Sequence, residues 1–407
     1  MFFEILFFVL FGVAAGTFTG LIPGVHTNTV CMILLSLFPL MLSYGMPIHG
    51  IISFIISMTV TNTIVDFIPS ILLGAPDDST ALSVLPGHKL LLEGKGLEAI
   101  YLTIVGGVGV VILFVLLLPF LLKFLPLLYG TIRQYIHFIL LAITFVMVII
   151  EKGLKGKFFG LMIFFLSGIL GLIVLNSLVL PANEMFFPLF TGLFGISTLL
   201  ISLNKKVKIP KQEKEMVNVD KKLAIFGSIK AFFSGLIVGI LPGVGSAQAT
   251  VLSQLATRKK DEKEFLVSVG GINTANALFA LVSLYAIGKP RSGSAVTVSK
   301  ILGSFGFNEL ILLIASGLIV TGIAAVLTLK LSKKFLDLVE KIPYDKLSLG
   351  IIIFLILLTF FFTGFLGLLV LFVSTTVGLL APLTGVKRSL GMGVLMLPVS
   401  LFYSGLA

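Results

Sequence analysis

Long apolar runs alternate with short polar clusters along the chain. The apolar runs are about 17–25 residues long, the length at which an α-helix spans a bilayer. Each half of the chain holds five such crossings and one apolar hairpin. We predict re-entrant hairpins at 5–42 and 224–257 and crossings at 51–72, 99–122, 133–150, 158–178, 186–203, 265–287, 308–330, 347–362, 364–381 and 389–405.

One polar stretch, Asn204 to Lys222, divides these runs into two sets. It carries seven lysines against three acidic residues, the composition of a cytoplasmic loop of a membrane protein. We therefore predict a first repeat at 1–203, a cytoplasmic linker at 204–222 and a second repeat at 223–407.

The two halves share a helix-breaking motif. Pro23 and Gly24 interrupt the first apolar hairpin, and Pro242 and Gly243 interrupt the second, at an offset of 219 (242 − 23). Proline removes a backbone donor and glycine tolerates a positive φ, so the pair ends a helix. Interrupted helices at matching positions of two repeats indicate the binding site of a transporter. Two kinked helices that only pack together are the alternative.

Loop charge predicts how the halves are oriented. The loop at 43–50 is uncharged and the one at 151–157 is basic, whereas the corresponding second-half loops are charged at 258–264 and neutral near 363–364. Because basic loops stay in the cytoplasm and five crossings is an odd number, we predict inverted repeats with both termini outside. The expected location is the cell membrane, with many passes.

Composition supports this class and excludes others. The chain is 57% hydrophobic and 12% charged, whereas soluble proteins have about 25% charged residues. The net charge of +11 is explained by basic loops, so we expect no nucleic acid partner. Cys31 is the single cysteine, and neither a metal-binding spacing nor a nucleophile–base motif is present. We expect no enzyme, no metal and no cofactor beyond a coupling Na⁺ or H⁺.

Small polar residues follow both helix breaks. Thr27 and Asn28 come after the first, and Ser246 comes after the second. The helix that starts after a break presents unpaired N–H groups and the positive end of its dipole, which favour an anion. We predict that these residues and the breaks bind the substrate.

Polar residues also stand inside two crossings. Asn62 and Thr63 lie in the first, and Asn273 and Asn276 lie in the second, where their side chains are candidates for substrate binding. Hydrogen-bonded contact between helices is the alternative. Asp66 follows one turn later, and an ionisable residue in a span is a functional candidate, unless it sits at the cytoplasmic end. We assign it to the coupling ion.

The hairpins after those crossings differ in charge. The first holds Asp77 and Asp78, which are candidates for the coupling ion or caps of the next helix. The second holds Lys289 and Arg291, which are candidates for an anion clamp. The alternative is that these two charges only orient the loop relative to the membrane.

These motifs resemble those of the TctA family, the large membrane subunit of tripartite tricarboxylate transporters. The resemblance spans both halves and rests on the breaks at 20–24 and 239–243, Gly74-Ala75-Pro76-Asp77 with 86–89 and 94–96, the segment 273–277, and the hairpin 288–293. It implies cation-coupled uptake of citrate-like carboxylates, with a small membrane subunit and an extracytoplasmic binding protein as partners.

We therefore expect an all-α polytopic membrane protein of two inverted repeats that works as a secondary transporter. Its substrate is a small organic anion, carried by alternating access. The alternative keeps the architecture and changes the substrate, because paired hairpin tips also suit a translocase that holds the phosphate of a polyprenyl lipid carrier. A homodimer is an assembly that we keep open.

Overall fold

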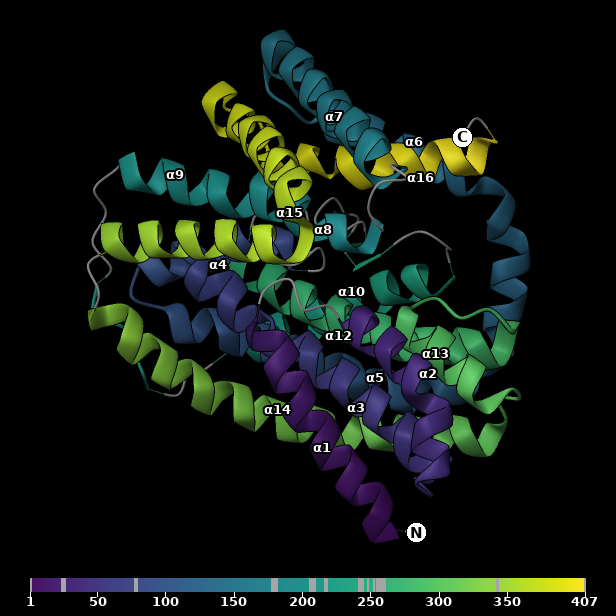
Figure 1. The fold of residues 1–407 in the computed structure, drawn as a ribbon. Coiled ribbons are helices and arrows are strands. Elements are labelled where there is room, and N and C mark those ends of the chain that lie inside the picture. The colour runs from purple at the N-terminus through teal and green to yellow at the C-terminus, as the bar shows by residue number, and fades with distance from the viewer. Residues whose placement is uncertain are drawn as a thin grey trace.

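The computed structural model is built of helices (Figure 1). It describes residues 2–22, 27–76, 80–176, 182–204, 210–215, 219–240, 245–246, 249–251, 253, 261–341 and 344–405. Within these ranges there is no strand, and nine helices are long and apolar enough to cross a membrane. The predicted class, an all-α polytopic membrane protein, is confirmed.

The elements of the first half follow one another with short connections. They are α1 (Phe2–Leu21), α2 (Thr27–Ser43), α3 (Ile48–Val65), η1 (Pro69–Leu73), η2 (Ala81–Ser83), α4 (Val84–Leu92), α5 (Gly96–Ile132), η3 (Arg133–Tyr135), α6 (Ile136–Ile149), α7 (Gly153–Leu175), α8 (Ala182–Phe190), η4 (Thr191–Ile196) and α9 (Ser197–Asn204). The second half comprises α10 (Lys221–Ile240), α12 (Glu262–Ile287), α13 (Gly293–Leu302), α14 (Phe307–Lys341), α15 (Tyr344–Thr384), η5 (Arg388–Met392) and α16 (Gly393–Ser404).

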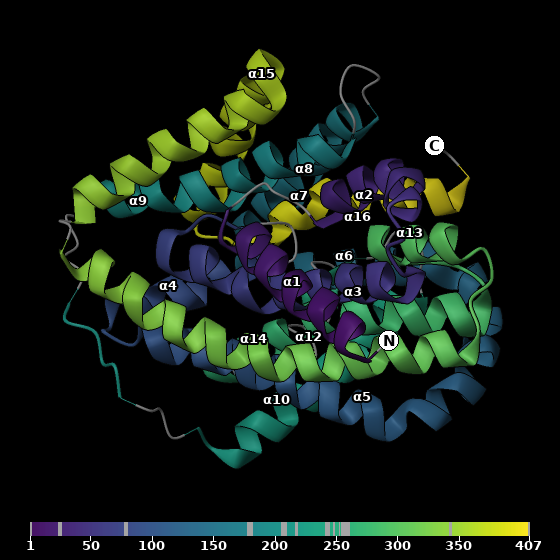
Figure 2. The same ribbon diagram turned by 60° about the horizontal axis from the view of Figure 1, so that its bottom comes forward.

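Two spans form the centre of the molecule (Figure 2). The first consists of α3 and η1 together, and the second is α12. Each is 26 residues long and is 94% buried over its most apolar stretch, so protein rather than lipid surrounds it. Each ends at a glycine in the left-handed region, Gly74 with φ 64° and Gly288 with φ 68°. A left-handed glycine is a common helix terminator. The shared length and ending are those that equivalent helices of two repeats would have.

Glycines allow a neighbouring helix to pack closely on each central span, α1 on α3 and α10 on α12. A Cβ at Gly12 or Gly16 of α1 would lie 2.6 Å or less from α3 atoms. On α10, a Cβ at Gly235 or Gly239 would lie within 2.7 Å of α12 side chains. Small residues that let two backbones approach are the usual contact between membrane helices. The glycines of the repeated motif therefore pack helices next to the breaks.

The closest approach joins the two halves. Gly106 of α5 crosses Gly270 and Gly271 of α12, and a Cβ at Gly106 would lie 1.8 Å from the carbonyl oxygen of Val267. The corresponding helix of the second half, α14, packs on α3 of the first half. The halves are thus interlocked rather than set side by side.

Gly106→Ala is expected to destabilise the protein by about 4 kcal/mol or to prevent folding, because the added methyl meets backbone that cannot move aside. Gly130→Ala on the same helix is the control, since no described atom lies within 4 Å of its would-be Cβ. Thermal unfolding of the purified proteins measures the difference. Equal midpoints for the two variants would contradict the close crossing.

The helices fall into two groups by their contacts. The inner group contains α1 to α5, α10 and α12 to α14, and the outer group contains α6 to α9, α15 and α16. Each group takes helices from both halves of the chain. The groups meet where η2 contacts η4 and where Gly195 of η4 lies against Gly74 and Pro76. In Figure 1 the outer group lies above the inner one.

Several predicted boundaries differ from the structure. The crossings at 99–122 and 308–330 are parts of α5 and α14, which run for 37 and 35 residues. At 1.5 Å per residue these helices are more than about 50 Å long and exceed the apolar thickness of a bilayer. The crossings at 347–362 and 364–381, by contrast, are two helical arms of α15 that meet at a kink, and the non-helical backbone of Gly364 (φ 62°, ψ −155°) lies where the turn between them was predicted.

The predicted linker is partly docked on the protein. Gln212 is buried, its side chain accepts a hydrogen bond from Gly96 N and donates to Leu91 O, and its backbone N–H donates to Glu340. Lys214 forms ion pairs with Asp337 at 2.7 Å and with Glu340 at 2.9 Å. The described part of the linker therefore ties the turn before α5 to the end of α14.

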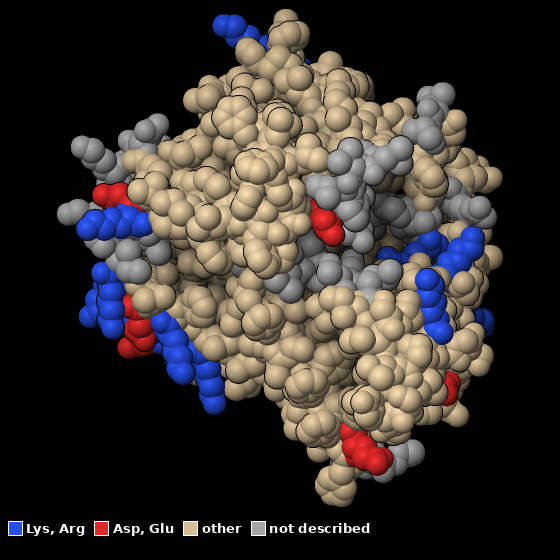
Figure 3. All heavy atoms as spheres, viewed as in Figure 1, with Lys and Arg blue, Asp and Glu red and all other residues tan. Residues whose placement is uncertain are grey.

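Most charged side chains of one face lie at its two sides. Figure 3 shows the lysines and arginines mainly over the ends of α14 and α9 on the left and near α13 on the right, with a broad, mostly uncharged surface between that carries a few acidic atoms near its centre and bottom. This is the distribution that a membrane-embedded protein needs, because hydrocarbon cannot solvate charge.

Candidate functional site

Two asparagine side chains reach accessible surface from inside the buried core. Every residue of α3 and η1 from 50 to 72 is buried except Asn62. Every residue of α12 from 266 to 284 is buried except Asn276. The two positions are 214 residues apart (276 − 62), the spacing that also separates Gly74 from Gly288. Each central span thus leaves one asparagine partly exposed, and the two asparagines stand at equivalent positions of the spans.

The two amides differ in their hydrogen-bond partners. Asn62 Nδ2 donates to Thr19 Oγ1 of α1 at 3.1 Å, and Thr19 Oγ1 donates to the carbonyl of Gly16 at 3.2 Å. No hydrogen bond joins the Asn276 amide to a residue of the described ranges. Asn62 is therefore oriented by its neighbour, whereas Asn276 is available to a ligand.

Beside Asn62, a buried polar cluster joins the central spans. Asn273 Nδ2 of α12 donates to the carbonyl of Thr63 at 3.1 Å and to Asp66 Oδ2 at 2.9 Å. The hydroxyls of Thr63 and Thr274 are 3.3 Å apart. Because both acceptors of Asn273 are oxygens, its NH₂ group must face them. The interhelical hydrogen bonds considered as the alternative role are thus present for Asn273 and Thr63.

Asp66 is a buried carboxylate within a membrane span. Only 4% of it is exposed, and it lies one helical turn after Asn62, at the end of α3. Ser70 Oγ donates to its backbone carbonyl at 2.8 Å and lies 2.6 Å from Thr80 Oγ1. A buried carboxylate costs several kcal/mol unless it is paired or neutral, so its presence here favours a functional role.

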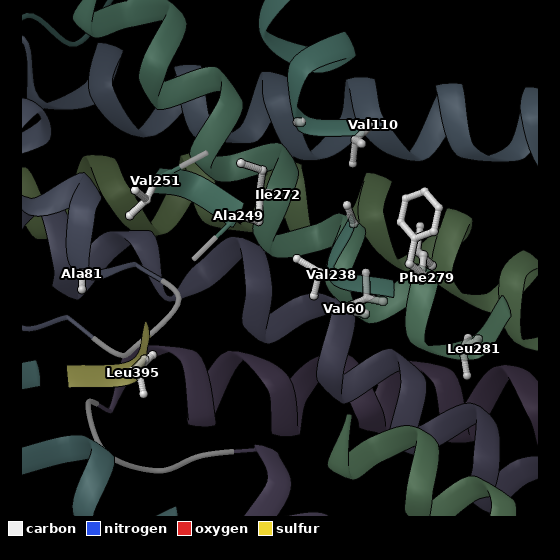
Figure 4. Close-up of a cluster of buried hydrophobic side chains, with 14 of the residues drawn as sticks. Val60, Ala81, Val110, Val238, Ala249, Val251, Ile272, Phe279, Leu281 and Leu395 are labelled. Carbon is white, nitrogen blue, oxygen red and sulfur yellow. The ribbon is translucent and has the colours of Figure 1, made fainter. Parts of the chain in front are cut away.

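The apolar residues next to the polar cluster in sequence are buried, Ile64 and Val65 on α3 and Ile272 on α12. Figure 4 shows Val60 of α3, Val238 of α10 and Ile272 of α12 lying together, with Phe279 nearby. A low local dielectric strengthens every hydrogen bond and every charge interaction made there. The setting is that of a binding site shielded from bulk water.

The structure locates only some of the residues predicted at the helix breaks. α1 ends at Leu21 and α2 begins at Thr27, as predicted for an interrupted helix. Thr27 is half-buried and Ser246 is buried. Outside the described residues lie Pro23, Gly24, Pro242, Gly243, Asp77, Asp78 and the side chain of Asn28.

The basic hairpin lies apart from the amides. Lys289 Nζ is 5.8 Å and the Arg291 guanidinium 5.0 Å from the ring centre of Tyr129, near the end of α5. Thirteen residues of helix and turn separate Asn276 from Lys289, which is about 20 Å at helical rise. One small anion cannot touch both, so these predicted site residues form two places rather than one.

Sequence reasoning missed Thr19, Ser70 and Thr80. Thr19 lies inside the repeated glycine motif, next to Gly20, which was a usable signal. Ser70 and Thr80 become neighbours only through the π-helical turn of η1 and the chain that follows it. In the described residues no group of three His, Cys, Asp or Glu side chains is arranged to hold a metal ion.

His88 borders this region on α4. It is almost fully buried, and its Nδ1 donates to the carbonyl of Ile71 at 3.2 Å. Burial lowers the pKa of the His88 imidazole, and the hydrogen bond to Ile71 opposes the shift. The neutral ring therefore holds η1 and α4 together.

Comparison with known proteins agrees with this picture. The model of the tripartite tricarboxylate transporter TctA family matches residues 6–393, nearly the whole chain. An uncharacterized protein of Methanocaldococcus jannaschii is 33% identical over 409 residues, and the alignment covers 98% of each chain. No solved structure matches.

Proposed function

The chain belongs to the tripartite tricarboxylate transporter TctA family, and on that premise we propose that it is a cation-coupled secondary transporter of a small carboxylate anion. Membership makes it a membrane protein of a transporter family, so we assign it no reaction to catalyse. The observation that carries the proposal is the pair of asparagines, Asn62 and Asn276, partly exposed at matching positions of two otherwise buried spans.

The two amides suit a carboxylate substrate. Amide N–H groups donate to carboxylate oxygens, and a hydrogen bond to a charged group contributes about 1.5–3 kcal/mol. The start of α2 at Thr27 adds backbone N–H groups and a favourable dipole. A substrate with carboxylates at both ends would meet one amide from each half. We place Lys289 and Arg291 earlier on the route, where they attract the anion.

Asp66 is our candidate for the coupling-ion site. Its carboxylate accepts a hydrogen bond from Asn273 Nδ2, and the carbonyl oxygen of Thr63 accepts a second hydrogen bond from the same nitrogen. Oxygens of this kind coordinate Na⁺, and the same carboxylate is able to take up H⁺ instead. Its position next to Asn62 would couple the charge of the ion to that of the substrate.

Alternating access would follow from movement between the two groups of helices. The amides, Asp66 and their neighbours all lie in the inner group. Because α5 packs on α12 and α14 packs on α3, the halves of the inner group are interlocked and would move as one body. We propose that the inner group shifts against the outer one and carries the site from one side to the other.

The proposed topology has both termini outside and repeats of opposite orientation. On a Cys31→Ala background, Ser43→Cys and Ser304→Cys are expected to react with a membrane-impermeant maleimide from outside, and Glu93→Cys and Lys346→Cys only from inside. All four positions are exposed. Labelling of Ser43→Cys and Glu93→Cys from the same side would rule out this orientation.

The family is the membrane component of a tripartite transporter, which supports partner subunits. We propose a small membrane subunit and an extracytoplasmic binding protein for this chain. A second copy of the chain is a further assembly to be tested, by mass measurement in detergent.

Uptake by proteoliposomes tests the proposed function. We expect a labelled tri- or dicarboxylate to accumulate when a Na⁺ or H⁺ gradient is imposed, with the binding protein added where the chain alone is inactive. The same preparation is tested for a thermal shift with a short polyprenyl phosphate. Stabilisation by the prenyl phosphate without any carboxylate uptake would favour the lipid translocase and overturn the proposal.

A further inference from the structure

Within the described residues, Arg388 of the outer group is a partly buried cation without an acidic partner. Arg388 opens η5 and is only partly exposed. Its Nη1 donates to Ser197 Oγ at 3.3 Å and to Thr198 Oγ1. Both hydroxyls donate in turn to carbonyls one turn earlier, those of Leu193 and Phe194, so they serve Arg388 as acceptors. The η4–α9 junction thereby fixes one nitrogen of the guanidinium.

The rest of the guanidinium remains available. No carboxylate in the described ranges lies within 4.0 Å of Arg388, and its Nε and Nη2 are not among the buried polar atoms that lack a partner. These two nitrogens form the edge of the fork that binds carboxylate or phosphate through two parallel hydrogen bonds. A desolvated guanidinium without a counter-ion is costly, which points to an anion that comes from outside the chain.

The surroundings of this edge are basic. The backbone N–H of Lys387 donates to Glu151 Oε1 at 3.3 Å, which joins η5 to the turn between α6 and α7. That turn carries Lys152 and Lys155, and both are exposed, as is Lys387. Glu151 is buried and brings one negative charge, against the four positive charges of Lys152, Lys155, Lys387 and Arg388, so the surroundings stay basic.

Large apolar side chains lie on the same turn. Leu154 is 86% exposed and Phe158 is 64% exposed. The first turns of α7 pack on η5, where a Cβ at Gly160 would lie 3.1 Å from Leu390. An anion at Arg388 is therefore bordered by lysines and by apolar surface of the kind that the acyl chains of a lipid cover.

We propose that Arg388, with Lys152, Lys155 and Lys387, binds the phosphate of an anionic membrane lipid at the membrane interface. The fork edge of Arg388 holds the phosphate oxygens, the lysines add charge, and the acyl chains lie along Leu154 and Phe158. Orientation of loops by basic residues requires lysines at the surface but does not require a guanidinium held in place by two buried hydroxyls. The site belongs to the outer group and is independent of the transported substrate.

Thermal unfolding of the purified protein in detergent tests the lipid site. We expect phosphatidylglycerol to raise the unfolding midpoint more than phosphatidylcholine does, and inorganic phosphate alone to leave it unchanged. Arg388→Gln is expected to abolish the difference between the two lipids. Lys300→Gln, which alters an exposed cation on α13, is the matched control and should respond as the wild type.

Lys152→Gln with Lys155→Gln provides a second test that leaves the buried hydroxyls untouched. Each lysine near an anionic lipid is worth about a fivefold change in affinity, so the pair should weaken phosphatidylglycerol binding by about 25-fold. An unchanged affinity in this pair, or an equal response of Arg388→Gln and wild type, would overturn the proposal. A shift by inorganic phosphate as large as that by the lipid would replace it with a free-anion site.

Discussion

Replacing Asn62 and Asn276 together with leucine is expected to reduce carboxylate uptake by at least about 100-fold. Leucine has nearly the shape of asparagine but cannot donate a hydrogen bond. If each amide contributes about 1.5–3 kcal/mol to the bound anion, losing both removes about 3–6 kcal/mol, and each 1.4 kcal/mol is a factor of ten. Initial uptake by proteoliposomes and equilibrium binding of a labelled carboxylate are the measurements.

Ser57→Ala is the matched control for this prediction. Ser57 also lies on α3, but it is buried and a Cβ at Gly12 of α1 would lie 2.6 Å from its own Cβ, so it faces a helix rather than accessible surface. The control should insert normally and transport at the rate of the wild type. Unimpaired uptake by the double leucine variant would mean that the two amides only join helices.

The class and the central spans could be predicted from the sequence because they depend on local properties. A run of apolar residues of membrane length that ends at glycine indicates α3 and α12 without knowledge of their neighbours. The equivalence of Asn62 and Asn276 could also be predicted, because it follows from the offset between the repeats. The close helix contacts at the glycines of the repeated motif were not predicted, because the motif indicated a helix break.

The remaining features depend on contacts between distant parts of the chain. That Asn276 is accessible while Asn273 is buried depends on what covers each face of α12, and both look alike in sequence. That Lys289 and Arg291 stack near Tyr129 rather than join the amides depends on the length of α12 and on its alignment with α5. A hydropathy pattern contains neither kind of information.

The division of the helices into an inner and an outer group is the clearest feature that depends on contacts between distant parts of the chain. The sequence indicates two repeats, whereas the structure divides the helices differently, with members of both halves in each group. The reason is that α5 and α14 each pack on the central span of the other half, which a one-dimensional repeat does not reveal. The movement that we propose is therefore one of the inner group as a body, whereas the sequence alone would suggest one repeat moving against the other.

Asp66→Asn is expected to abolish the dependence of uptake on the coupling cation and to lower accumulation by about 100-fold. The amide oxygen of the new side chain keeps an acceptor for Asn273, whose distance to the present carboxylate is 2.9 Å, so the fold should be retained. What is lost is the charge that would hold a cation in a low dielectric, an effect worth several kcal/mol. Accumulation of a labelled carboxylate with and without the gradient is the measurement.

Glu151→Gln is the control for Asp66→Asn, because Glu151 is also a buried carboxylate but lies in the outer group. It should alter stability without changing the cation dependence. Wild-type stimulation by the gradient in Asp66→Asn would place the coupling site elsewhere.

The same substitution at Asp66 also separates the two coupling ions. If the ion is H⁺, the introduced amide resembles the protonated carboxyl group, and the variant should still exchange substrate across the membrane without accumulating it. If the ion is Na⁺, the bound cation is missing, so exchange should fail as well. Counterflow of a labelled carboxylate in vesicles loaded with the unlabelled anion distinguishes these two outcomes.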